Sequence, residues 1–189
     1  MRENRDLRDV SADGLVAFEA GDVAVSGTAA PVRDVRWEKA YAGLPATVSQ
    51  VRRDVRAVLG PCPAVVADDV ELVVSELAGN AIRHSRSGEP GGAYAVRISH
   101  LVTEKVPYVW VEVVDQGSSS WDGTLRAEPA HGLAVVRQLS TFTGSDSEPD
   151  GQRVVFARLD YSAGGMPLYG TGPVPELPAD LSGVRDFDS

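Results

Sequence analysis

The feature that most constrains the fold is a long, largely apolar segment between residues 64 and 84. Its apolar side chains recur at helical spacing, which predicts a single helix of about six turns. The apolar face consists of Val66, Val70, Val73, Leu77 and Ala81. A helix with such a face is stable only when the face is buried, so the segment is expected to pack against a core.

Two polar residues lie one turn apart on this helix. Asn80 is only about 40° around the axis from Glu76 and sits at the edge of the apolar face, beside Val73. A half-buried amide without a partner costs about 1–3 kcal/mol, so Asn80 requires one. A carboxylate and an amide that point together into a cavity suit a site for a magnesium-bound nucleotide. Taken alone, Glu-x-x-x-Asn is common and more often describes a solvated pair.

Length and charge narrow the classes of function. A chain of 189 residues can form one domain with a substantial core. The net charge of −9 argues against non-specific binding of nucleic acid. Much of the acidity lies in the ends, because residues 1–30 carry −3 and residues 160–189 carry −4. We therefore expect a folded domain at 31–160, a flexible or loosely docked extension at 1–30, and a disordered Gly- and Pro-rich tail at 161–189.

The single cysteine, Cys62, excludes an intrachain disulfide and a cysteine-pair zinc site. We interpret it as a small buried or loop residue. The first nine residues lack the apolar stretch of a secretory signal, and charges interrupt every apolar run short of a membrane span. The sequence therefore predicts a cytoplasmic protein that contacts neither membrane nor nucleic acid directly.

Periodicity in the middle of the chain predicts an order of β-α-α-β-β-loop-α-β-β. Strands are expected at 36–42, 94–98, 109–114, 141–145 and 153–159, and helices at 47–59, 64–84 and 132–139. Two adjacent helices followed by strand pairs predict an α+β two-layer sandwich, with helices on one face of a mixed, mostly antiparallel sheet. Residues 118–130 show no clear period, and we interpret them as a mobile loop.

Three segments carry the residues from which a site could be built. They are Glu76 with Asn80 on the long helix, Asp115-Gln116-Gly117 after the strongest strand, and Ala130-His131-Gly132-Leu133 at a loop-to-helix junction. Each segment by itself is weak evidence for a site. Asp-x-Gly after a strand is more often a turn, and a glycine that begins a helix is more often a steric requirement.

In this order the three segments resemble the histidine-kinase-like ATPase superfamily, the GHKL group, which has the Bergerat-type ATP-binding fold. More narrowly, the helix segment 71–85, which reads Glu-Leu-Val-Val-Ser-Glu-Leu-Ala-Gly-Asn-Ala-Ile-Arg-His-Ser, is similar to anti-sigma-factor serine/threonine kinases of bacterial regulators. The preceding Leu44-Pro45 and the arginines at 52 and 53 fit the same resemblance. It covers about residues 36–160, and its most specific part is the helix segment.

The resemblance implies a role for each residue. Asn80 would ligate Mg²⁺ through its side-chain oxygen, which suits a hard cation that also holds a triphosphate. Glu76 would act as the base that takes a proton from a serine or threonine hydroxyl of a protein substrate. Asp115 would accept a hydrogen bond from the adenine amine of ATP, and Gly117 would let the backbone approach the base closely.

The third segment would hold the phosphates. Gly132 and the helix that continues through Leu133 would present N–H groups to them, with His131 beside the glycine. Residues 118–131 would form a lid that closes to exclude water. Arg83 could also reach a phosphate, although a solvated arginine is the simpler interpretation.

The chain departs from the family pattern at the nucleotide site. The family usually has Gly-Arg-Gly-Leu where this chain has Ala130-His131 before the glycine. Histidine is largely neutral near pH 7, so a fixed positive charge near the phosphates is lost. An ungapped alignment also places Val154 where the family has a threonine near the adenine, and valine forms no hydrogen bond.

Two functions follow from the resemblance. The first is an ATP- and Mg²⁺-dependent serine/threonine protein kinase that phosphorylates an anti-sigma antagonist and binds a sigma factor, with a homodimer as an open expectation. The departures favour the alternative, a catalytically weak or inactive nucleotide-binding module that sequesters a protein partner. A sensor histidine-kinase fragment is disfavoured, because residues 1–30 show no helical heptad.

Overall fold

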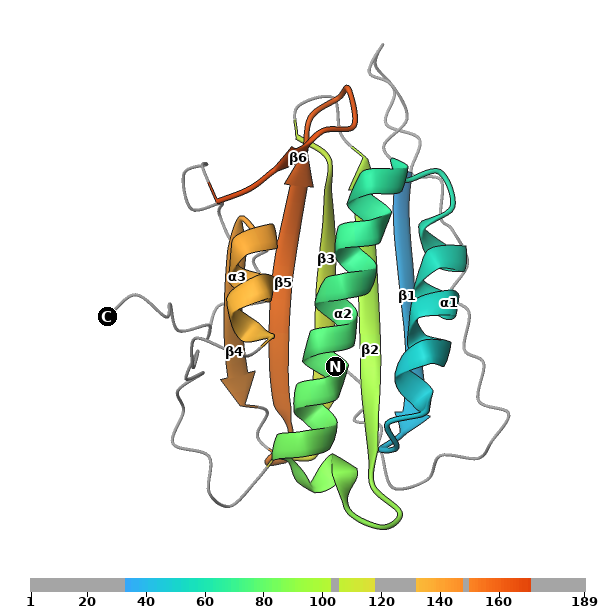
Figure 1. Ribbon diagram of the computed structural model, residues 1–189, viewed down its shortest axis with the longest axis vertical. Coiled ribbons are helices and arrows are strands. Elements are labelled where there is room, and N and C mark those ends of the chain that lie inside the picture. The colour runs from blue at the N-terminus through green and yellow to red at the C-terminus, as the bar shows by residue number, and fades with distance from the viewer. Residues whose placement is uncertain (1–32, 103–105, 118–131, 148–149, 171–189) are drawn as a thin grey trace.

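The computed structural model describes residues 33–102, 106–117, 132–147 and 150–170. These residues form two layers, with three helices on one face of an open six-stranded sheet (Figure 1). This arrangement confirms the α+β sandwich predicted from the sequence. Within the described part of the chain, no helix is long and apolar enough to cross a membrane.

The predicted order of strands and helices is confirmed. The elements are β1 (Arg33–Ala42), α1 (Thr47–Leu59), α2 (Ala64–His84), the 3₁₀ turn η1 (Arg86–Gly88), β2 (Ala93–Val102), β3 (Tyr108–Asp115), α3 (Leu133–Leu139), β4 (Phe142–Ser147), β5 (Arg153–Tyr161) and β6 (Pro167–Leu168). The sequence did not predict η1 or β6. Because β6 pairs with β5, regular structure continues past residue 160, where the tail was expected to begin.

The sheet has the order β1-β2-β3-β5-β4, and each neighbouring pair is antiparallel. The strand predicted at 109–114 lies in the middle of this order. Its register with β5 places Asp115 directly opposite Arg153. Two residues that are far apart in the sequence thus meet at one end of the sheet.

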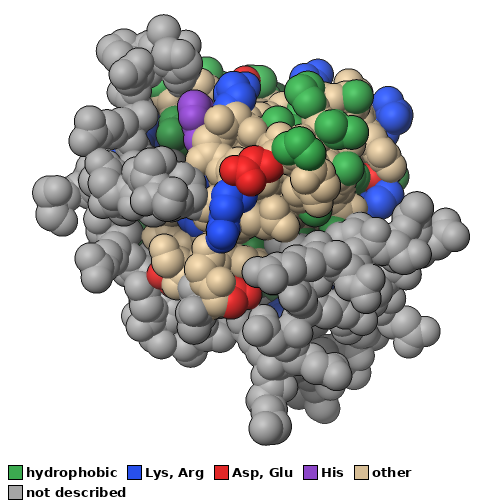
Figure 2. Space-filling model, turned by 90° about the horizontal axis from the view of Figure 1, so that it is seen from below, with side chains coloured by type: hydrophobic (Ala, Val, Ile, Leu, Met, Phe, Trp, Pro, Cys, Tyr) green, Lys and Arg blue, Asp and Glu red, His purple; other side chains and the backbone are tan. Residues whose placement is uncertain are grey.

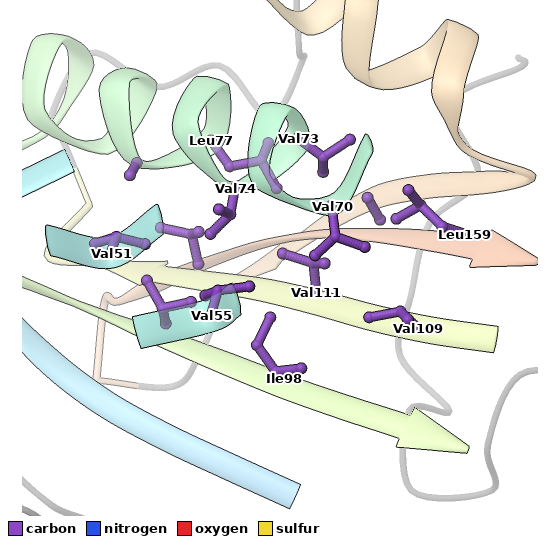
Figure 3. Packing of buried hydrophobic residues seen from close by; sticks show 14 of the residues in the cluster. Val51, Val55, Val70, Val73, Val74, Leu77, Ile98, Val109, Val111 and Leu159 are labelled. Carbon is purple, nitrogen blue, oxygen red and sulfur yellow. The ribbon is translucent and has the colours of Figure 1, made fainter. Parts of the chain in front are cut away.

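The main core fills the space between the helices and the sheet. The five apolar residues predicted on α2 each expose 2% or less, and they pack with Val51 and Val55 of α1 against strand residues such as Ile98 and Val111 (Figure 3). Burial of such side chains contributes about 1.5–3 kcal/mol each. This packing holds α2, and hence Glu76 and Asn80, in a fixed position over the sheet.

A second apolar cluster lies on the opposite face of the sheet. It consists of Ala95, Trp110, Val114, Phe142, Val154 and Phe156, with Trp110 and Phe156 stacked at a centroid distance of 5.1 Å. Because side chains alternate along a strand, Val154 points away from the helices, whereas Arg153 points toward them. Val154 thus lies in the second cluster, on the face away from the helices, whereas Arg153 lies on the face that carries Asp115.

Candidate functional site

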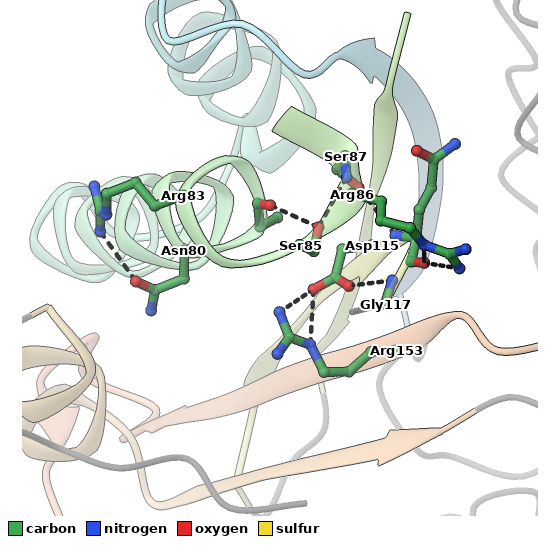
Figure 4. Close-up of polar contacts among 10 residues, drawn as sticks. Asn80, Arg83, Ser85, Arg86, Ser87, Asp115, Gly117 and Arg153 are labelled. Carbon is green, nitrogen blue, oxygen red and sulfur yellow. Dashed lines mark hydrogen bonds and ion pairs between the residues drawn. The ribbon is translucent and has the colours of Figure 1, made fainter. Parts of the chain in front are cut away.

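The end of α2 and the turn η1 hold the loop that follows β3. The backbone N–H of Arg86 donates to the Gly117 carbonyl at 2.9 Å, and its guanidinium donates to the Gln116 carbonyl at 2.6 and 3.0 Å. The Gln116 N–H donates to the Ser87 hydroxyl oxygen at 2.9 Å. These bonds fix the Asp115 loop against the C-terminal end of the helix that carries Glu76 and Asn80, so two of the three predicted segments are neighbours (Figure 4).

This end of the molecule, seen from below, carries charged side chains of both signs close together on its described surface (Figure 2). Hydrophobic side chains gather to one side of them.

The third predicted segment also reaches α2. Gly132, directly before α3, lies against the carboxylate of Glu76, and a Cβ added to Gly132 would overlap that carboxylate. The absence of a side chain at Gly132 thus leaves the space that the predicted base occupies, and a larger residue would have to displace the end of the Glu76 side chain. Leu133, the next residue, packs against the main core, which anchors the start of α3.

Asn80 has one satisfied and one unsatisfied polar atom. Its Oδ1 accepts a hydrogen bond from Arg83 Nη2 at 3.0 Å, and both side chains are labelled in Figure 4. Its Nδ2 is buried and has no hydrogen-bond partner among the described residues. A buried, unpaired amide costs about 1–3 kcal/mol. The unpaired Nδ2 is a donor, so it suits an oxygen atom of a ligand, whereas a metal would have to be held by Oδ1 in place of the hydrogen bond from Arg83.

Asp115 is held by an arginine that the sequence argument did not find. Arg153 Nε donates to Asp115 Oδ2 at 2.8 Å, and Arg153 Nη2 contacts the same oxygen. The other oxygen, Oδ1, accepts the Gly117 N–H at 2.8 Å. The two side chains are 1% and 4% exposed, so this is a buried ion pair (Figure 4). Both oxygens of the predicted adenine acceptor are engaged within the protein.

The electrostatics of Asp115 follow from its burial. Loss of solvation raises the pKa of the carboxyl above its ordinary value, and the Arg153 charge, the Gly117 N–H and Ser85 act in the opposite direction. A buried charge that is paired and hydrogen-bonded is stable, whereas the same charge without its partner is not. The carboxylate of Asp115 therefore depends on Arg153.

A sequence signal for Arg153 did exist. The residue directly precedes an apolar run, Val154-Val155-Phe156-Ala157, and a charged side chain beside such a run needs a partner if it is buried. The sequence argument instead selected the neighbouring Val154, which lies on the other face of the sheet. In a strand, a shift of one residue exchanges the two faces of the sheet.

Gly117 has a structural role of its own. Its φ is +65°, a backbone conformation that favours glycine, and an added Cβ would overlap the carbonyl oxygen of Gly151. The turn before β5 thus closes against the loop after β3. This close contact with the Gly151 backbone is distinct from the approach to a nucleotide base expected of Gly117, which stays a prediction.

Some expected residues lie outside the described ones. They are Ala130, His131 and the remainder of the proposed lid at 118–131. In the described part of the chain, no group of three or more His, Cys, Asp and Glu side chains is placed to hold a metal ion. A magnesium ion here would need oxygen atoms from the bound nucleotide in addition to Asn80.

Comparison with known families accounts for the arrangement. The model of the histidine kinase-like ATPase domain matches residues 41–158, which is more than half of the chain. The match begins at the end of β1 and includes α2, the loop after β3, α3 and most of β5. A search of curated proteins found no match to the chain.

Proposed function

The chain belongs to the histidine kinase-like ATPase domain family, and on this basis we propose that it is an ATP-dependent serine/threonine protein kinase of the anti-sigma type. Domains of this family bind ATP, typically with Mg²⁺. The finer proposal is that the chain phosphorylates an antagonist protein and thereby regulates a sigma factor. It is supported by the resemblance of the α2 segment to such kinases.

The observation that carries the proposal is the contact between Glu76 and Gly132, with Asn80 one turn further along α2. Magnesium-bound ATP would supply the phosphoryl group and the charge that activates it. Asn80 would hold the metal through its amide oxygen. Glu76 would accept the proton of the substrate hydroxyl on a carboxylate oxygen, and Gly132 leaves the space that this carboxylate occupies.

The fit to ATP differs between the two ends of the site. The buried, unpaired Nδ2 of Asn80 is an incomplete site that a ligand can complete. Asp115, in contrast, is engaged by Arg153 and the Gly117 N–H. This second observation favours the alternative function, a nucleotide-binding module with weak or no phosphate transfer that acts by sequestering a protein partner.

The proposal is tested by separating binding from chemistry. Calorimetric titration of the full chain with MgATP should show that Asn80→Ala lowers nucleotide affinity at least tenfold, because it removes the metal ligand. Glu76→Gln should retain affinity within about twofold and lose phosphate transfer to the antagonist, because it removes only the base. Gln50→Ala, an exposed amide on α1, and Glu89→Gln, an exposed carboxylate, are the matched controls.

The outcomes distinguish the two functions. Transfer of phosphate by the wild type and its loss in Glu76→Gln support the kinase. Binding of MgADP without any transfer supports the sequestering module. If wild type binds neither nucleotide while remaining folded, both functions are wrong.

A further inference from the structure

We propose that Arg153 is a specificity-determining residue: by occupying Asp115, it prevents the site from selecting adenine. Nucleotides are then held chiefly through their phosphates and metal, with little discrimination between purine bases. This inference rests on the proposed nucleotide-binding function and concerns the opposite end of the same site.

The first step of the argument is the hydrogen-bonding capacity of Asp115. A carboxylate is an acceptor at both oxygens, and only a free lone pair can receive the amine of an adenine. Here Oδ2 receives two nitrogens of the Arg153 guanidinium, and Oδ1 receives the Gly117 N–H at 2.8 Å. The N–H donors of the chain itself thus occupy three of the roughly four acceptor positions of the carboxylate, and its burial limits access of a base amine to the remaining one.

The second step is burial. Asp115 exposes 1% of its side chain and Arg153 exposes 4%. Withdrawal of Arg153 would leave a buried carboxylate without its partner, which is strongly unfavourable. The ion pair is therefore a stable competitor of the base and differs from an exposed arginine, such as Arg83, that can turn into solvent.

The third step is that the backbone enforces the pair. Asp115 ends β3 and Arg153 begins β5, and the sheet register places them directly opposite one another. Alternation along β5 directs Arg153 to the helix-facing side, the side on which Val155 and Ala157 enter the core. The close contact between Gly117 and Gly151 fixes the end of the sheet at which this pair lies. Two strands and a tight turn position Arg153, so its place does not depend on a mobile loop.

The fourth step concerns what remains available to a ligand. At the other end, the buried Nδ2 of Asn80 lacks a partner among the described residues, and the oxygen of that amide is held only by an exposed arginine. Asn80 thus has an unsatisfied hydrogen-bond donor where the phosphates and metal would lie. Asp115 is already bonded within the protein where the base would lie. The ligand class is a magnesium-bound purine nucleotide whose base is not read by Asp115.

The experiment compares two nucleotides on the full chain. Titration calorimetry should give wild-type affinities for MgADP and MgGDP that differ by less than about threefold, since neither base reaches Asp115. Arg153→Thr, which frees the carboxylate, should bind MgADP at least tenfold more tightly than wild type does and prefer it to MgGDP at least tenfold, the value of one charge-assisted hydrogen bond. Arg158→Thr is the matched control, because Arg158 lies on β5, pairs with Asp160 and points to the opposite face of the sheet.

A wild-type preference for MgADP of tenfold or more overturns the inference, and this comparison needs no variant. Unchanged or weaker MgADP binding by a folded Arg153→Thr, as judged by circular dichroism, also overturns it. In both cases Asn80-dependent binding would leave the proposed function intact. Absence of binding of either nucleotide to folded wild type overturns the proposed function, and this inference with it.

Discussion

The two ends of the candidate site differ in how their polar groups are satisfied. At the α2–α3 end, Glu76 lies beside Gly132, and Asn80 has a buried nitrogen with no partner among the described residues. At the β3–β5 end, Asp115 and Arg153 are almost fully buried and bonded to one another. The unpaired nitrogen of Asn80 destabilises the first end until a ligand binds. At the second end, both oxygens of Asp115 already have hydrogen-bond partners.

This difference reflects the elements that form each end. The first is assembled from side chains of one helix, α2, beside the glycine that precedes α3, and such side chains can adjust their rotamers when a ligand arrives. The second is set by the register of two strands, and a register cannot adjust without moving a whole strand. We infer that affinity resides in the helical end and that the strand end governs stability and base selectivity.

The largest expected loss of stability comes from removing one partner of the ion pair at the β3–β5 end. Asp115→Ala should lower the free energy of unfolding by about 3–5 kcal/mol, because Arg153 is left buried without its counter-charge. Urea denaturation measures the change. The double variant Asp115→Ala/Arg153→Met should recover most of the loss, since no buried charge then remains. A loss in the double variant that equals the sum of the two single losses would show that the pair is not coupled.

The same pair predicts a dependence on pH. Burial raises the folded-state pKa of Asp115 above its unfolded value, and removal of Arg153 raises this pKa further. The folded state then binds more protons than the unfolded state, so the stability of Arg153→Thr should decrease as pH rises through that folded pKa. The destabilisation relative to wild type should thus be smaller near pH 4 than near pH 7 in urea titrations. A difference that does not change with pH would mean that Asp115 keeps the same charge over this range.

A smaller effect is expected where the two helices meet. Gly132→Ala should destabilise the fold by about 1 kcal/mol, because its Cβ displaces the end of the Glu76 side chain, and should weaken nucleotide binding, because it crowds the helix start that would present N–H groups to the phosphates. Gly164→Ala is the control, since an added Cβ there meets only the Ser162 hydroxyl at 3.7 Å. Thermal unfolding with and without MgADP measures both effects. Equal behaviour of the two variants would show that Glu76 and Gly132 are not in tight contact.

The sequence predicted the helical end better than the strand end, for a physical reason. The limits of α2 and its buried face follow from a local period of apolar residues, which is visible within one segment. The half-buried position of Asn80 follows from the same helical geometry. The nearness of Gly132 to Glu76 was reached only through the family resemblance.

The strand end depends on contacts between distant segments. Asp115 and Arg153 are 38 positions apart and meet only because β3 and β5 pair in one register, which no local pattern specifies. The sequence argument selected the adjacent Val154, whose side chain faces the other side of the sheet. The short strand β6 was missed for a related reason, because its two residues are defined by pairing with β5 and have no period of their own.

The smallest expected effect on stability comes from Asn80, and its small size is informative. Asn80→Ala removes a buried amide nitrogen without a partner and an exposed hydrogen bond to Arg83, so the two changes oppose one another. The free energy of unfolding without nucleotide should therefore change by less than about 1 kcal/mol in urea denaturation. With MgADP present, wild type should gain stability in proportion to the logarithm of ligand concentration, and Asn80→Ala should gain little. If removal of the Asn80 amide leaves the fold equally stable but abolishes stabilisation by MgADP, the role of Asn80 is to bind the ligand. A large loss of stability without nucleotide would instead place Asn80 with Asp115 among the residues that hold the fold.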